Sequence, residues 1–115
     1  MFIQNKMLIG EYDFVWSYIL EFENNKNPYF DKRRTIAEWK HLATTYCVAS
    51  EQIVVYAESL HKLGIKAKDA LHISCAIYTR CDYFITIDKK LLNTPLKDII
   101  IVNPINFITE LEELI

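Results

Sequence analysis

Three acidic residues stand where an α/β protein commonly gathers its ligands. Glu23 lies on a predicted helix behind a short apolar segment, Asp69 lies in the first turn of another, and Asp88 directly follows the apolar run YFITI. In open parallel sheets ligands bind outside the carboxyl ends of the strands, so we expect these carboxylates to converge on one pocket. Carboxylates gathered there hold Mg²⁺ or Mn²⁺ together with waters. Such a metal polarises a phosphate and helps to generate hydroxide, which is the chemistry of a phosphodiesterase.

Each of these acids also has a purely structural interpretation. An acidic residue in a first turn complements the helix dipole, and this suffices to explain Asp69. Asp88 could cap the short turn KKLL that follows it. Glu23 shares its helix with Glu21 and could lie on a solvated face. Spacing alone leaves the functional and the structural interpretations open.

Other side chains with chemical potential are more simply assigned to the core. His72 and Cys75 are three residues apart on one predicted helix and could touch one metal, but further soft ligands at the spacing of a zinc site are lacking. Core packing is therefore the preferred interpretation for both. Five aromatic residues on apolar helix or strand faces are also expected in the core rather than on a base-stacking platform. They are Tyr18, Phe22, Trp39, Tyr56 and Phe84.

The first half of the chain is expected to supply one strand and two helices. Residues 13–16 (DFVW) are read as a strand, followed by a helix that Ser17 caps and that runs to about Lys26. Asp31 is expected to cap the second helix, and residues 46–49 form a short link or strand. Apolar positions at helical spacing predict that one face of the second helix is buried. They are Ile36, Trp39, Leu42, Ala43 and Tyr46.

The second half alternates helices with apolar runs. Ser50 is expected to open a helix that ends at Gly64, where a left-handed residue belongs. Its predicted apolar stripe consists of Ile53, Val54, Ala57, Leu60 and Leu63. Another helix, over 68–78, is apolar nearly all round and should be deeply packed. Residues 83–87 and 99–102 are apolar without alternation, as in parallel strands covered on both faces. A short turn over 89–92 and a helix after Pro104 complete the order.

Length and composition favour one compact domain. The chain has 115 residues, 51% hydrophobic and 24% charged, with a net charge of −2. Alternating helices and strands predict the α/β class with a parallel sheet. The acidic balance lacks the basic footprint of a protein that grips duplex DNA. No apolar run is long enough for a membrane span, the opening residues do not resemble a signal peptide, and three cysteines are a poor disulfide framework. A cytoplasmic location is expected.

Three segments carry a resemblance to a known family. KAKDALHISCAIYTRCDYFITIDKKLL (66–92) resembles the C-terminal half of PIN domains, with an Asp-Ala-Leu-His helix and an Asp-Tyr-Phe strand that ends in Thr-x-Asp. SYILEFENNKNP (17–28) resembles the Ser-led helix that supplies the glutamate of this family. IIIVNPINFI (99–108) resembles its last strand and helix. The resemblance extends in the family order from about residue 13 to residue 107.

The resemblance implies a three-layer α/β/α fold and an Mg²⁺- or Mn²⁺-dependent endoribonuclease, such as the toxin of a toxin–antitoxin pair. Glu23, Asp69 and Asp88 match the catalytic, metal-binding acids of the family, with Glu21 as the fallback if the first helix shifts by two residues. Thr86 matches a residue that orients substrate or metal-bound water. Asp82 is read as a turn residue. The implied partners are RNA, an antitoxin protein and a second copy of the chain.

One part of the PIN pattern is absent. The family begins with a central strand that carries a further metal-binding aspartate, and no such Leu-Asp-Thr sequence precedes Gly10. The single domain, residues 1–115, is therefore expected to be incomplete at its N-terminus. Three outcomes are open: strands 13–16 and 83–87 pair directly, a neighbouring chain donates a strand, or the natural protein begins further upstream. The last is favoured, and the chain as numbered should then express poorly. The alternatives to the enzyme are a non-catalytic binding or assembly module and an unrelated α/β fold.

Overall fold

The computed structural model describes residues 12–113. The expectations for the opening residues, including the absence of a signal peptide, lie outside this range. The elements follow one another as β1 (Val15–Ser17), α2 (Tyr18–Asn25), α3 (Phe30–Trp39), the 3-10 turn η1 (Lys40–Leu42), β2 (Thr45–Cys47), α4 (Glu51–Lys62), α5 (Ala67–Tyr78), β3 (Tyr83–Ile85), α6 (Lys89–Leu92), β4 (Ile100–Val102) and α7 (Pro104–Glu113). The chain thus combines helices with short strands in the predicted order.

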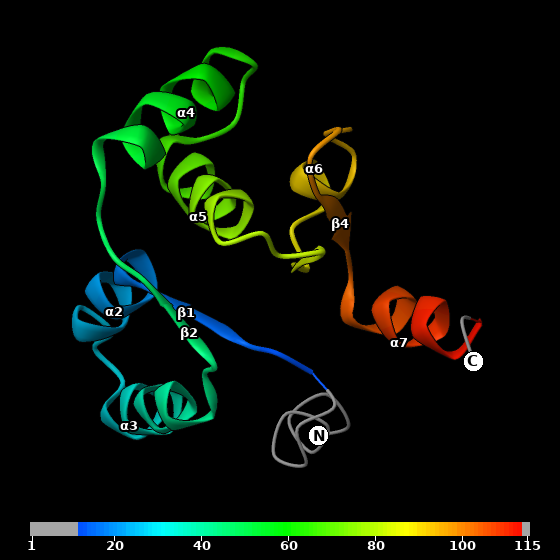
Figure 1. Cartoon of the computed structure of the whole chain (residues 1–115). Helices are drawn as coiled ribbons and strands as arrows, with labels where there is room; N and C mark the ends of the chain where they lie inside the picture. Colours follow the sequence, from blue (N-terminus) through cyan, green and yellow to red (C-terminus); the bar gives the residue numbers. More distant parts are fainter. Residues whose placement is uncertain (1–11, 114–115) are drawn as a thin grey trace.

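The strands form two separate parallel pairs. β1 pairs with β2, with Trp16 opposite Tyr46, and β3 pairs with β4, with Phe84 opposite Ile101. The mixture of helices and parallel strand pairs is compatible with the predicted α/β class, but the described strands form two two-stranded sheets rather than one. Figure 1 shows β1 and β2 beside α2 and α3, while β4, α6 and α7 lie on the other side of the molecule and α4 and α5 lie above. Within residues 12–113, β1 and β3 are not paired, so direct closure between these two strands is not found.

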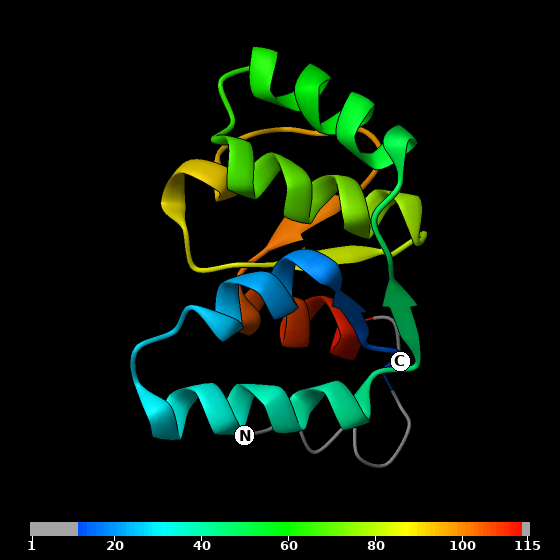
Figure 2. The same ribbon diagram turned by 90° about the vertical axis from the view of Figure 1, so that its left-hand side faces the viewer.

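Helix α5 packs against both halves of the molecule. Ala70 and Ile73 belong to one buried cluster that also contains Leu60 of α4 and Leu91 of α6. Cys75 belongs to a second cluster with Ile19, Cys47 and Ile53, which lie on α2, β2 and α4. Figure 2 shows α4 and α5 lying side by side above the strands. The nearly all-round apolar character of α5 is explained by these contacts on different sides.

Local signals set most helix ends. The Ser17 hydroxyl accepts a hydrogen bond from the Leu20 amide at 3.2 Å, and the Ser50 hydroxyl accepts one from the Ile53 amide at 3.3 Å. Each satisfies an amide that has no partner inside its own helix. Gly64, just after α4, has a φ of +99°, which a residue with a Cβ rarely adopts. These three sequence predictions are confirmed.

The prediction for the second helix is wrong in two respects. α3 begins at Phe30, and its N-cap residue is Tyr29, which makes no side-chain capping bond, while Asp31 lies in the first turn. No residue of α3 is buried, and Tyr46 is 54% exposed. The reason is that α3 packs mainly against the short α2 and continues into η1, so its apolar stripe has little to face.

The strand predictions also need correction. β1 begins at Val15 and β3 ends at Ile85, so both are shorter than the apolar runs suggested. Ile85 and Ile100 are 38% and 50% exposed, and Ile87 beyond β3 is 83% exposed. These strands are therefore not covered on both faces, since these side chains remain open to solvent. The stripe of α4 is likewise narrower than predicted, since Val54 and Leu63 are exposed. No described helix has the length and apolar character that crossing a membrane requires.

A substitution at Ser74 tests the contact between α4 and α5. Its hydroxyl donates a hydrogen bond of 2.7 Å to the carbonyl oxygen of Ile53 inside the core. We expect Ser74→Ala to lower the free energy of unfolding by about 1 kcal/mol, since a buried hydrogen bond is lost. Ser59→Ala is the matched control, because the Ser59 hydroxyl bonds the carbonyl of Tyr56 on the exposed side of α4. Urea denaturation of both variants measures the difference, and equal effects would contradict the prediction.

Candidate functional site

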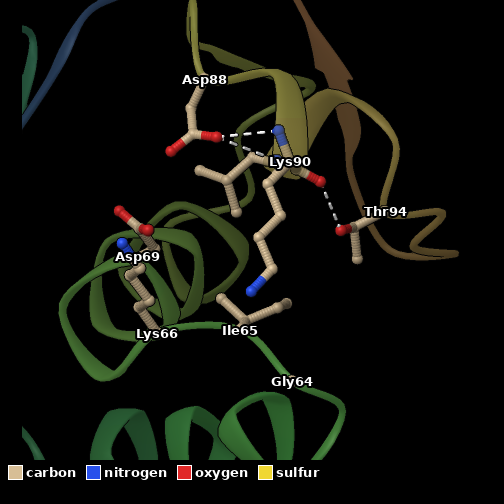
Figure 3. Close-up of a pocket in the computed structure, with 8 residues that line it drawn as sticks. Gly64, Ile65, Lys66, Asp69, Asp88, Lys90 and Thr94 are labelled. Carbon is tan, nitrogen blue, oxygen red and sulfur yellow. Dashed lines mark hydrogen bonds between the residues drawn. The ribbon is translucent and has the colours of Figure 1, made fainter.

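Asp69 and Asp88 line one pocket between the start of α5 and α6 (Figure 3). The pocket has a volume of about 90 Å³. A single water needs roughly 10–15 Å³ of such space, so the pocket has room for several waters or a hydrated cation. Its other lining residues are Gly64, Ile65, Lys66, Lys90, Leu91 and Thr94.

Asp69 reaches the pocket from the first turn of α5. Its side chain is half-buried, and no residue between 12 and 113 makes a hydrogen bond or ion pair with its carboxylate. Figure 3 shows this carboxylate pointing toward the side on which Asp88 lies. The dipole of α5 favours a negative charge here, as the structural interpretation requires. That interaction leaves the carboxylate oxygens open to a ligand.

Asp88 has a structural role that is visible in its bonds. It is the N-cap residue of α6, and its Oδ1 accepts hydrogen bonds from the amides of Lys90 at 2.8 Å and Leu91 at 3.4 Å. In Figure 3 the other carboxylate oxygen points away from α6. The cap therefore fixes the carboxylate with one oxygen and leaves the second for the pocket.

Thr86 shapes the turn that presents Asp88. Its hydroxyl accepts a hydrogen bond of 3.1 Å from the Asp88 amide. Its own amide donates to the carbonyl of Val102 at 2.9 Å, which ties the turn to β4. Thr86 is thus placed to position Asp88, and it is not among the residues that line the pocket.

Glu23 does not line this pocket, although it was predicted to converge there with the other two acids. Its Oε1 lies 3.0 Å from Nε2 of His72, on α5. His72 follows Asp69 by three residues, so the two share one face of the helix. Glu23 therefore stands beside the helix face that carries Asp69. Glu23 lies on α2, which packs against α5, whereas Asp88 caps α6.

The two acids that were given secondary roles lie elsewhere. Glu21, the fallback for Glu23, forms an ion pair of 2.7 Å with Lys40, and its hydrogen bond raises the pKa of the Lys40 ammonium group. This pair ties α2 to the end of α3. The exposed Asp82 immediately precedes β3, where its carbonyl accepts a bond from the Ile100 amide at 3.3 Å. It occupies the amino end of the strand, where a turn residue was expected.

Cys75 is packed in the core, as expected. It is 1% exposed, and burial followed by a hydrogen bond with Cys47 raises the pKa of its thiol to about 12. Metal binding requires the thiolate, which is scarcely populated near neutral pH at such a pKa. His72, one turn earlier on α5, is directed to Glu23 instead. The two residues therefore face different surroundings and do not form the pair considered from the sequence.

The pocket offers a mixed set of charges for binding a ligand. Mg²⁺ needs only one or two carboxylates when waters and substrate phosphates complete its shell, so Asp69 and Asp88 fit this ion. Residues 12–113 contain no group of three or more His, Cys, Asp or Glu side chains arranged to enclose a metal. Lys66 and Lys90 add positive charge that suits phosphate oxygens. The donor set therefore favours a cation bound together with an anionic ligand.

Sequence reasoning missed the two lysines and the partner of Glu23. Lys66 precedes Asp69 by three residues and Lys90 follows Asp88 by two, so both lie inside the motif that supplied the acids. Their proximity to the acids was a usable signal. The contact between Glu23 and His72 spans 49 positions and has no local signal.

Comparisons with known proteins found no matching protein-family model, no matching curated protein and no matching solved structure. The resemblance to PIN domains consequently depends on the motif residues themselves. The shared pocket of Asp69 and Asp88 is a separate, geometric observation on the site.

Asp88 allows its capping role to be separated from its charge. Asn caps helices about as well as Asp, whereas Ala removes the capping oxygen at a cost of about 1 kcal/mol. We expect Asp88→Ala to lower the free energy of unfolding by that amount in metal-free buffer, and Asp88→Asn to leave it nearly unchanged. Thermal denaturation of both variants with EDTA measures this. Equal losses for Ala and Asn would show that the negative charge, and not the cap, stabilises α6.

Proposed function

We propose that this protein is a PIN-type endoribonuclease that hydrolyses phosphodiester bonds with Mg²⁺ or Mn²⁺. The observation that carries the proposal is the shared pocket of Asp69 and Asp88, which come from a helix start and from beyond the carboxyl end of a parallel strand. Ligands of α/β proteins bind at such edges. The two acids are 19 residues apart in sequence and occupy the positions that the motif resemblance assigns to metal ligands.

The residues of the pocket have different roles in binding. Asp69 and Asp88 hold the cation, with waters completing its shell. When bound, the metal polarises the phosphate and lowers the pKa of a coordinated water. Lys66 and Lys90 bind phosphate oxygens, and Thr86 keeps Asp88 in place through the turn. Glu23 lies outside the pocket lining, beside the same face of α5, and its assignment as the third acid rests on the motif resemblance.

The order of the strands supports a PIN-like three-layer fold. In that fold a central strand separates the counterparts of β1 and β3, and here these two strands belong to different sheets. The proposed biological role, by resemblance, is that of a toxin held inactive by an antitoxin protein. A homodimer is the accompanying proposal for the assembly.

A non-catalytic binding or assembly module is the second candidate function. It is favoured by the contact between Glu23 and His72 and by the absence of a three-ligand group among residues 12–113. In this candidate the acids serve as helix caps and dipole partners. Activity and metal binding separate the two candidates.

Cleavage of single-stranded RNA is the decisive test of the enzyme. We expect cleavage with Mn²⁺ or Mg²⁺ that EDTA abolishes, and a fall of roughly 100-fold or more for Asp69→Asn, as for other losses of electrostatic stabilisation at active sites. Asp82→Asn is the matched control, since Asp82 is an exposed acid outside the pocket. Gel analysis of end-labelled RNA gives the rates. Equal cleavage rates for Asp69→Asn and Asp82→Asn would contradict the enzyme and favour the non-catalytic module.

Metal binding gives a readout that does not depend on activity. A cation that binds the native state alone stabilises it by mass action, so we expect millimolar Mg²⁺ or Mn²⁺ to raise Tm. Asp69→Asn should lose most of this increase while retaining a wild-type Tm in EDTA to within a few degrees. Differential scanning fluorimetry measures both values. A melting curve that the metals leave unchanged would remove the metal site from the proposal.

A further inference from the structure

The connection between α2 and α3 carries a group of aromatic rings with cations above them. The Lys26 ammonium lies 4.2 Å from the centre of the Phe22 ring, and the Lys32 ammonium lies 5.0 Å from that of Tyr29. The Arg33 guanidinium lies 5.5 Å from the centre of the Phe30 ring. We call this surface the aromatic tip, and its members are Phe22, Lys26, Tyr29, Phe30, Lys32 and Arg33.

The rings of the aromatic tip are open to solvent. Phe22, Tyr29 and Phe30 are 53%, 64% and 61% exposed. Figure 2 shows α3 at the outer edge of the molecule, away from α4 and α5. Phe22 was expected in the core from its sequence pattern, and this expectation is wrong. A cluster of large rings with this much exposure is typical of an interaction surface.

Charge indicates what the tip binds. Residues 26–34 contain four basic residues and one acidic residue, a net charge of +3 in a chain whose net charge is −2. The cores of protein–protein interfaces are depleted of charge, and of lysine in particular. Single-stranded nucleic acids, in contrast, require cations for the phosphates and ring faces for the bases. The composition of the tip therefore favours a nucleic-acid strand over a protein partner.

The tip is also held in shape before anything binds. The side-chain amide of Asn24 donates to the carbonyl of Arg33 at 2.9 Å, and the Arg33 guanidinium donates to the carbonyl of Asn27 at 3.5 Å. The Tyr29 amide donates to the side-chain oxygen of Asn27 at 3.0 Å. A surface already ordered in the free protein loses less conformational entropy on binding. An open hollow along α3, lined from Asp31 to Trp39, continues the surface.

We propose that the aromatic tip binds a nucleic-acid single strand, and the choice of RNA as that strand rests on the proposed function. Bases stack on Tyr29, Phe30 and Phe22, and the phosphates between them pair with Lys26, Lys32 and Arg33. No residue of the tip lines the pocket of Asp69 and Asp88. RNA binding at the tip requires neither the metal nor cleavage. It therefore goes beyond the proposed hydrolysis.

Binding is measured by fluorescence anisotropy with a labelled single-stranded oligonucleotide RNA in EDTA, which excludes metal-dependent cleavage. Stacking contributes enough per base that we expect Tyr29→Ala and Phe30→Ala each to weaken binding by about tenfold. Tyr78→Ala is the matched control, because Tyr78 is 51% exposed at the end of α5, and we expect it to bind as the wild type does. Equal loss in the control, or none in the tip variants, overturns the proposal.

The charges are tested by salt dependence. Phosphate contacts make the affinity fall with salt, so Lys32→Gln should reduce the slope of log Kd against log salt by about 0.7, the value for one contact with a single strand. Lys97→Gln, an exposed lysine outside the tip, should leave that slope unchanged. Wild-type binding to a duplex RNA as tight as to the single strand would overturn the stacking model. Sedimentation that shows self-association lost in Tyr29→Ala, without any RNA binding by the wild type, would instead assign the tip to a contact between copies.

Discussion

The packing of α5 is the constraint on which the rest of the molecule depends. Ile73 is fully buried, and the neighbouring Ser74 and Cys75 are each 1% exposed. One side of the helix contributes to the cluster with α4 and α6, and another to the cluster with α2 and β2. The two described sheets share no strand pair. Side-chain contacts with α5 therefore hold the two halves together, as backbone hydrogen bonds do in a continuous sheet. Both Asp69 and His72 are placed by this helix.

Features governed by neighbours in sequence could be predicted without coordinates. Ser17 and Ser50 cap the helices they were assigned to, because a hydroxyl three residues before a free amide is a local arrangement. Gly64 ends its helix for an equally local reason, a positive φ. Asp31 failed as a cap because any polar residue near a helix start gives a similar signal, and the observed cap, Tyr29, lies two residues before it.

Features governed by distant segments could not be predicted. Hydrophobicity correctly placed a strand at the start of the run from Tyr83 to Ile87, but β3 ends at Ile85. Whether the faces of a strand are covered depends on which distant segments pack against them, and Ile87 is 83% exposed. The same limit applies to the site. Asp69 and Asp88 were recognised from their positions at element ends, while the contact of Glu23 with His72 follows from how α2 rests on α5. Phe22 was assigned to the core on periodicity, which identifies an apolar face but not whether anything covers it.

The three acids are unequally anchored, and this has a mechanical consequence. Ala70, next to Asp69, and Leu91, three residues after Asp88, belong to the same buried cluster, so one core body holds the segments that carry both carboxylates. Glu23 is carried on α2, which reaches that body through α5. A small rotation of the β1–β2 half would thus swing Glu23 toward or away from the pair without altering the spacing between Asp69 and Asp88. In the proposed metal site, the number of carboxylates within reach of a cation would then depend on how the two halves align.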